Sequence, residues 1–272
     1  MIRPKKTILA ATALPLLLAG WSVPAAAQGE EETEKKEPRR TRVGVGAQLV
    51  PSYPGAEDYS LRPLVAVSRT RGSKPFDFEA PDESFGLSLI DESGFEFGPA
   101  LNFEGSRRAQ DVGAALDKVP STFEAGAFVQ YAFGPKFRVR AEGRKGLGGH
   151  DGWTGQASAD FVARNGDDWL FSVGPRLTWS DARYHRAYFG VTAPESVRTG
   201  IAAYRPGGGI QAIGATAGFL TQLSKRFGLY SYAKYDRLVG DAADSPLVRG
   251  FGSRDQLSGG LALTYTFGGG SK

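Results

Sequence analysis

The sequence predicts an all-β fold: a transmembrane, antiparallel, up-and-down β-barrel of about twelve strands, or ten without two weak candidates. Three observations predict it: apolar and polar side chains alternate along many segments, short and long connections take turns, and aromatic residues gather near segment ends. In residues 153–164, Trp153 and Phe161 share one face, and Thr154 and Asp160 share the other. The apolar faces mix alanine and glycine with aromatics, which fill a soluble core poorly and suit lipid. We therefore expect them to face outward.

The first 27 residues predict a secretory signal peptide. Arg3, Lys5 and Lys6 precede a short apolar run, and small residues surround a cleavage position after Ala27. Cleavage leaves 30 of the 33 basic side chains against 29 acidic ones. The mature chain is therefore almost neutral, and its charge gives no support for nucleic-acid binding. The lack of cysteine excludes a disulfide and a thiolate metal site.

Residues 28–42 form a mixed-charge segment without a large apolar side chain. Five glutamates stand beside five lysines or arginines, a composition typical of solvated, flexible chain. We expect a flexible periplasmic leader here, with a docking segment for a partner as the alternative.

The barrel is predicted to span residues 43–267. When the twelve expected strands are numbered along the chain, a short turn follows each even-numbered strand and a longer loop follows most odd-numbered ones. Bacterial outer-membrane barrels show this arrangement, with both chain ends on the rim of the short turns. Residues 268–272 form a short tail behind Phe267, an aromatic residue suited to recognition by the barrel-assembly machinery. The expected strands, of which the third and fourth are the weakest, are 43–50, 61–70, 75–80, 84–91, 94–104, 122–133, 136–146, 152–164, 168–181, 209–222, 227–240 and 255–267.

The polar faces predict a narrow or plugged lumen rather than a general porin. They carry both signs of charge, and opposite charges in a narrow interior pair across it. The long segment 182–208 holds Tyr188, Phe189 and Tyr204, which would cover the mouth, enter the lumen or contact an external partner. The inward charges expected to pair are Arg138, Arg140, Arg176, Glu124, Glu142 and Asp160.

Candidate catalytic groups are few. His150 and His185 are the only histidines, and both fall near long loops. Ser180 and Asp181 lie close to His185 in sequence, which would suit a rim-located lipid hydrolase only if the fold assembled a triad. A histidine without a catalytic role is the simpler interpretation. No cofactor and no transition-metal site is expected.

One loop motif predicts a structural contact. Asp241 and Asp244 could ligate a divalent cation, but a turn capped by their side chains before Pro246 explains the same residues. We expect Arg237 to pair with one of these aspartates and to fix the loop, with Ser245 and Pro246 in the turn.

Four stretches, PSYPGAEDYSLRP, VGPRLTWSDARYHRAYFGVT, YDRLVGDAADSPLV and GLALTYTF, resemble the MipA/OmpV family of outer-membrane proteins. The resemblance runs from about Val43 to Phe267. It implies an outer-membrane barrel, which we expect to be a monomer in contact with outer-membrane lipid. One member is known as a scaffold that joins a lytic murein transglycosylase to a penicillin-binding protein, and others are associated with adhesion or antibiotic response. The family brings no catalytic residue to this chain.

These observations leave three candidate functions to be tested. The first is a non-enzymatic scaffold that links a murein hydrolase and a murein synthase to the outer membrane. The second is a narrow channel for small solutes or cationic antibiotics, and the third is the rim-located lipid hydrolase. The scaffold meets a physical objection, because only short turns and the 28–42 leader would reach the periplasm.

Overall fold

The computed structural model describes residues 37–268. The predicted signal peptide, residues 28–36 of the leader and the residues after Gly268 lie outside the described part. Strand β1 begins at Arg39. Residues 39–42, which the sequence places in the leader, therefore belong to the barrel, because they pair with the neighbouring strands.

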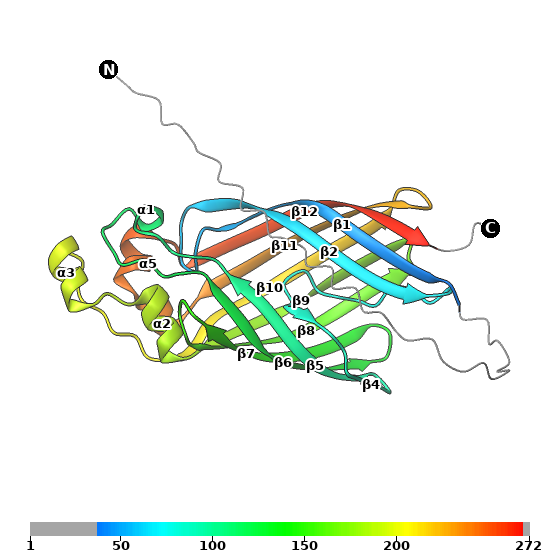
Figure 1. Cartoon of the computed structure of the whole chain (residues 1–272), viewed down its shortest axis with the longest axis horizontal. Helices are drawn as coiled ribbons and strands as arrows, with labels where there is room; N and C mark the ends of the chain where they lie inside the picture. The colour runs from blue at the N-terminus through cyan, green and yellow to red at the C-terminus, as the bar shows by residue number, and fades with distance from the viewer. Residues whose placement is uncertain (1–36, 269–272) are drawn as a thin grey trace, which may run out of the picture. The chain divides into compact units, whose positions relative to one another are not determined.

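One antiparallel sheet forms the fold (Figure 1). Each strand from β5 onward pairs with the next one in the chain, β12 pairs with β1, and β1 pairs with β2. Both ends of the barrel segment lie on one rim, where Arg40 stands opposite Gly268. This is the predicted up-and-down arrangement. The strands are β1 (Arg39–Pro51), β2 (Tyr59–Arg71), β3 (Phe85–Gly86), β4 (Ile90–Glu92), β5 (Phe95–Glu104), β6 (Thr122–Phe133), β7 (Phe137–Leu147), β8 (Trp153–Asn165), β9 (Trp169–Ser180), β10 (Gly209–Gln222), β11 (Phe227–Leu238) and β12 (Asp255–Gly268).

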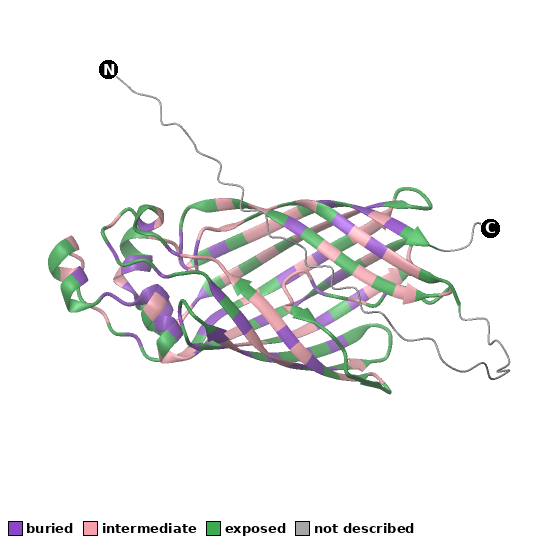
Figure 2. Cartoon of the chain, in the orientation of Figure 1, coloured by how far each residue is buried: buried purple, intermediate pink, exposed green. Residues whose placement is uncertain are grey.

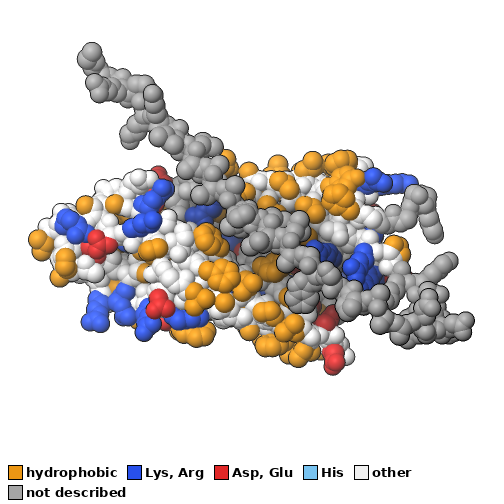
Figure 3. Space-filling model, in the orientation of Figure 1, with side chains coloured by type: hydrophobic (Ala, Val, Ile, Leu, Met, Phe, Trp, Pro, Cys, Tyr) orange, Lys and Arg blue, Asp and Glu red, His pale blue; other side chains and the backbone are white. Residues whose placement is uncertain are grey.

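Strand β7 shows that the barrel is apolar outside and charged inside. Its buried positions include Arg138, Arg140 and Glu142, whereas Phe137 is 55% exposed and Val139 is 41% exposed. The same alternation of buried and exposed residues runs along most strands (Figure 2). Hydrophobic side chains cover much of the middle of the face seen in Figure 3. Water would not tolerate so large an apolar exterior and lipid does, so the sheet spans a membrane.

The predicted third strand, 75–80, is wrong. Residues 74–84 run through the barrel interior without ladder pairing, and we call them the plug. The predicted fourth strand, 84–91, is broken into the short strands β3 and β4, which both pair with β5. The described residues therefore hold twelve strands, of which ten are long.

Backbone pairing does not close the barrel between β2 and the β3–β5 edge. Within residues 37–268 no ladder joins these two edges, and we call this line the seam. The edge strand β2 carries Pro63, whereas the prolines Pro99 of β5 and Pro175 of β9 lie in strands that pair on both sides. Proline lacks the N–H that a ladder needs and is therefore tolerated best on edge strands. Pro63 therefore fits the edge position of β2, but proline alone does not identify the seam from the sequence.

Short helices and loops gather at the rim opposite the one that holds Arg40 and Gly268, and we call this assembly the cap (Figure 1). Its helices are α1 (Ala109–Val112), α2 (Ala182–Phe189), α3 (Ala193–Thr199), α4 (Gly240–Asp244) and α5 (Pro246–Phe251). None of the helices in the described region has the length and apolarity that crossing a bilayer demands. The cap has its own hydrophobic core, which includes Tyr53, Tyr188, Phe189, Leu238 and Leu247.

Candidate functional site

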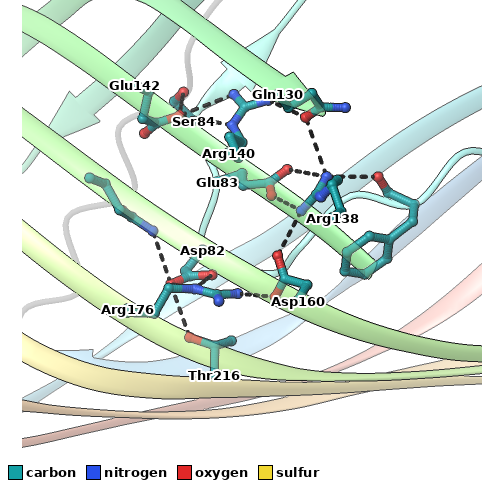
Figure 4. A network of polar contacts seen from close by, with 12 residues as sticks. Asp82, Glu83, Ser84, Gln130, Arg138, Arg140, Glu142, Asp160, Arg176 and Thr216 are labelled. Carbon is teal, nitrogen blue, oxygen red and sulfur yellow. Dashed lines mark hydrogen bonds and ion pairs between the residues drawn. The ribbon is translucent and has the colours of Figure 1, made fainter. Parts of the chain in front are cut away.

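The plug is held in the lumen by ion pairs with three barrel strands (Figure 4). Asp82 accepts from Arg176 Nε on β9 at 2.9 Å, and its Oδ2 lies 3.2 Å from Lys234 Nζ on β11. Glu83 pairs with Arg138 on β7. Asp160 on β8 completes the chain of charges, because it accepts from Arg138 at 3.0 Å and from Arg176 at 2.8 Å.

Barrel arginines also hold the backbone and aromatic rings of the plug. Arg138 Nη1 donates to the carbonyl of Phe78 at 3.1 Å, and Arg164 Nη1 donates to the carbonyl of Phe76 at 2.8 Å. The guanidinium of Arg138 lies 4.4 Å from the Phe78 ring centroid, and that of Arg42 lies 4.1 Å from the Phe76 ring centroid. A guanidinium that stacks and donates at once fixes an irregular segment without needing strand pairing.

A second set of buried charges continues from the plug toward the cap. Glu142 accepts from Ser84 of the plug at 2.7 Å and from Arg140 at 3.0 Å, and it also pairs with Arg144. Arg144 Nε in turn donates to Glu124 at 2.9 Å. The structure thus places all six predicted lumen charges inside the barrel and in ion pairs, and these are Arg138, Arg140, Arg176, Glu124, Glu142 and Asp160.

Two cavities remain around the plug. The first, of about 320 Å³, lies between plug and cap and is lined by polar and charged side chains such as Glu104, Gln156 and Lys234. The second, of about 510 Å³, lies between the plug and the inner face of β2, and it includes Val65 and Phe85 at the seam. The plug therefore leaves two separate spaces for small molecules.

The cap brings together the three aromatics that the sequence singled out. Tyr188 and Phe189 on α2 have no exposed surface, and burial raises the pKa of the Tyr188 phenol well above its usual range. Tyr204 donates its hydroxyl to the carbonyl of Asp241 at 2.9 Å. The segment 182–208 therefore folds over the mouth, and the plug comes from a different part of the chain.

The predicted pairing of Arg237 is wrong. Its guanidinium pairs with Asp255 on the adjacent strand at 2.6 Å, whereas Asp244 pairs with Arg249 and Arg254. The reason is register, because Arg237 stands directly opposite Asp255 in the β11–β12 ladder. The carboxylate of Asp241 instead accepts from the backbone N–H of Gly207 at 2.6 Å.

The turn residues of this motif are structural. Ser245 caps α5, because its hydroxyl accepts from the N–H of Leu247 at 3.1 Å and donates to the carbonyl of Phe189 at 2.7 Å. Pro246 follows as the first residue of α5, where a missing N–H costs no hydrogen bond. Among the described residues, no group of three or more acidic or histidine side chains could hold a metal ion.

The two histidines make structural contacts. His150 Nε2 lies 3.1 Å from Glu124, and His185 Nδ1 lies 2.6 Å from the carbonyl of Gly207. Ser180, the candidate nucleophile, donates to Gln211 instead of contacting His185, and Asp181 caps α2 through the N–H groups of its first turn. Burial lowers the pKa of His185, although the Gly207 carbonyl and nearby carboxylates oppose this effect. The described geometry shows no Ser–His–Asp triad at this place.

The acidic residues that join the plug to the barrel strands were not predicted from the sequence. Asp82 and Glu83 lie in the predicted link between two strands, and Pro81 just before them was a signal that the strand ends there. Glu195 was also missed, although Thr192 and Glu195 have the spacing of a capping box at the start of α3. Burial raises the pKa of Glu195, but hydrogen bonds from Thr192 and from the N–H of Asp117 outweigh it and hold the pKa low.

A family model described as MltA-interacting protein MipA matches residues 43–267. No curated protein matches the chain in sequence. Among solved structures, the COG4313 outer membrane channel from Pseudomonas putida F1 is 10% identical and has a TM-score of 0.34, covering 89% of this chain and 100% of that chain. OprG from Pseudomonas aeruginosa is 11% identical and has a TM-score of 0.29, covering 85% of this chain and 97% of that chain. These structural likenesses are too slight to carry an argument.

Proposed function

We propose, since this chain belongs to the MltA-interacting protein MipA family, that it is an outer-membrane barrel with a plugged lumen that holds a murein transglycosylase at the membrane. The chain is an outer-membrane protein with an apolar, lipid-facing exterior. The partner class comes from the family description. A penicillin-binding protein recruited to the same complex is the second partner that we propose.

The filled lumen is the observation that carries this proposal. Asp82 and Glu83 tie the plug to β7, β9 and β11 in the interior, and the cap core lies over the mouth. Buried ion pairs that lose one partner leave an uncompensated charge, so the plug resists displacement. A barrel whose lumen is filled by its own chain is better suited to holding a partner than to passing solutes.

The periplasmic contact should begin where the barrel meets the leader. Arg39 and Arg71 stand opposite each other at the short-turn rim, and both are exposed. The leader 28–36 precedes this point directly and adds charges of both signs. The rim arginines and the charged leader are two candidate docking segments, which answers the objection that short turns alone give a partner little to hold.

Co-purification tests the scaffold. Tagged mature protein from gently solubilised envelopes should enrich a lytic transglycosylase, and deletion of residues 28–36 should abolish the enrichment. Deletion of residues 269–272 at the other end of the chain is the matched control and should leave it unchanged. Recovery of the barrel without any murein enzyme would refute the scaffold.

A narrow passage for small cationic solutes is the second candidate. The cavity between plug and cap favours it, because its lining holds five carboxylates and only three basic side chains, namely Asp82, Glu104, Glu124, Glu142 and Asp236 against Arg62, Arg144 and Lys234. Planar-bilayer recordings with a polyamine gradient test it. Discrete cation-selective steps, reduced in Glu104→Gln, would favour the passage over the scaffold, and silent membranes would exclude it.

A further inference from the structure

The second cavity joins the barrel interior to the membrane at the seam. Its lining includes Val65 and Val67 of β2 and Phe85 of β3, whose side chains are 64%, 44% and 71% exposed on the lipid side. The same lining includes Arg42 and Thr264 in the interior. The cavity is therefore amphipathic, with an apolar mouth in the bilayer and a polar end in the lumen.

Two buried polar side chains at the inner end have atoms without a hydrogen bond, although Arg42 also forms a long ion pair with Asp167. Arg42 is 8% exposed, and its Nε and Nη2 atoms have no hydrogen bond; Nη2 is 3.7 Å from Asp167. Thr264 is 3% exposed, and its hydroxyl oxygen has no hydrogen bond either. A buried guanidinium with free N–H donors beside a free hydroxyl is a site for an oxyanion, because an unpaired buried donor is costly.

The same cavity also holds two unpaired carboxylates. In the described part of the chain, Asp77 and Glu79 of the plug have neither a hydrogen bond nor an ion pair, and both are exposed. Arg42, Asp77 and Glu79 all line this one cavity, so the free donors and the two carboxylates belong to one region. The other charged groups of the lining are engaged, and these are Arg138 with Glu83, Arg140 with Glu142, Arg164 with Asp167, and Glu96 with Ser88.

We propose that this cavity binds the head group of a zwitterionic phospholipid with a primary ammonium, of the phosphatidylethanolamine type. The phosphate oxygens accept from Arg42 and Thr264, and the ammonium donates to Asp77 and Glu79. The acyl chains leave through the seam and lie on Val65, Val67 and Phe85. A ligand with one anionic and one cationic group matches the free N–H donors of Arg42 and the two carboxylates without a hydrogen bond.

The depth of the site fits a lipid of the periplasmic leaflet. Arg42 lies three residues beyond Arg39, where β1 begins on the rim of the short turns, and it stands opposite Thr266 near the end of β12. The head groups of that leaflet are phospholipids, and they lie at this rim. This proposal is independent of the murein partner, because it concerns the membrane side of the barrel.

Native mass spectrometry tests the site. The purified barrel is equilibrated with equal amounts of phosphatidylethanolamine, phosphatidylglycerol, phosphatidylcholine and oleate, and the retained lipid is identified. We expect phosphatidylethanolamine to be retained about tenfold over the others, as charge-assisted hydrogen bonds at both ends of the head group predict. Equal retention of all four, or a preference for oleate or phosphatidylglycerol, would overturn the proposal.

Three variants separate the two ends of the head group. Arg42→Gln should weaken retention of every phosphate lipid. The double variant Asp77→Asn, Glu79→Gln, which alters only exposed side chains, should remove the preference for the ethanolamine head group and leave the barrel folded. Arg69→Gln is the control, since it removes an exposed positive charge of β2 outside the cavity lining. An unchanged preference in the double variant would refute the ammonium contact.

Discussion

Ser245 joins two parts of the cap through a single hydroxyl. It is fully buried, donates to the carbonyl of Phe189 and accepts from the N–H of Leu247. Ser245→Ala should leave both groups unsatisfied and cost the cap about 1–3 kcal/mol. Limited proteolysis should then show faster cleavage in residues 241–254. Arg237→Ala is the control, because the Arg237–Asp255 pair is solvent-exposed, and it should leave the digestion pattern unchanged. The reverse result would show that Arg237 anchors the loop.

Asp82 is a carboxylate that holds the plug to both β9 and β11. Asp82→Asn should cost about 3 kcal/mol, at the low end for a broken buried pair, because Arg176 keeps Asp160 and Lys234 keeps Asp236. The temperature at which the barrel unfolds, seen as a shift in its mobility on a gel, should fall. Asp151→Asn breaks pairs that are exposed and should leave this temperature unchanged. Equal effects of the two substitutions would contradict the anchoring role.

The alternation of side chains predicted which residues face the lumen but not all of their partners. Arg138, Arg140 and Arg176 occupy inward positions because every second residue of a strand points the same way. Two of these arginines pair with distant residues of the plug: Arg138 is 55 residues from Glu83 in sequence, and Arg176 is 94 residues from Asp82. Local periodicity contains no information about contacts at such separations.

At the scale of elements, the plug was mistaken for a strand for a physical reason. Phe76 and Phe78 alternate with Asp77 and Glu79, which is the pattern of a half-buried strand. In the structure the two rings contact barrel arginines, so the alternation is real but serves stacking rather than a sheet. The long strands were predicted more closely because most of their outward positions are apolar, although polar residues such as Arg69 in β2 and Ser231 in β11 interrupt this pattern.

Helix α2 gives the cap a dependence on pH. His185 is buried and neutral, and its pKa is lowered from 6.5 in the unfolded chain, chiefly by desolvation. A group with a lowered pKa contributes its full stability above the unfolded value and loses it as the pH falls through the folded value. Proteolysis of residues 182–208 should therefore be faster at pH 5 than at pH 7.5. His185→Gln removes the titrating group and should flatten this difference, and an equally steep dependence in the variant would assign it to another group.

At the scale of the whole molecule, the barrel has two barriers in series, the plug and the cap. Solutes must pass both, so removing one should leave the barrel silent in planar bilayers. Replacing residues 75–83 by a glycine–serine linker, or replacing residues 183–206 by a short turn, should each give little conductance. The combined variant should give a stable open pore, because ten long strands remain to enclose a lumen.

Comparing the conductance of the two single variants shows whether the plug or the cap is the main barrier. Heat-modifiable mobility on a gel is the control for each variant, since an unfolded barrel cannot be interpreted. Conductance in the plug variant alone would show that the cap is permeable and that the plug, held by Asp82 and Glu83, closes the barrel by itself. Conductance in the cap variant alone would show the opposite, that the 320 Å³ and 510 Å³ cavities connect around the plug. Either result would support the function as a passage for small solutes. Conductance only in the combined variant would support a barrel whose interior is filled to block passage.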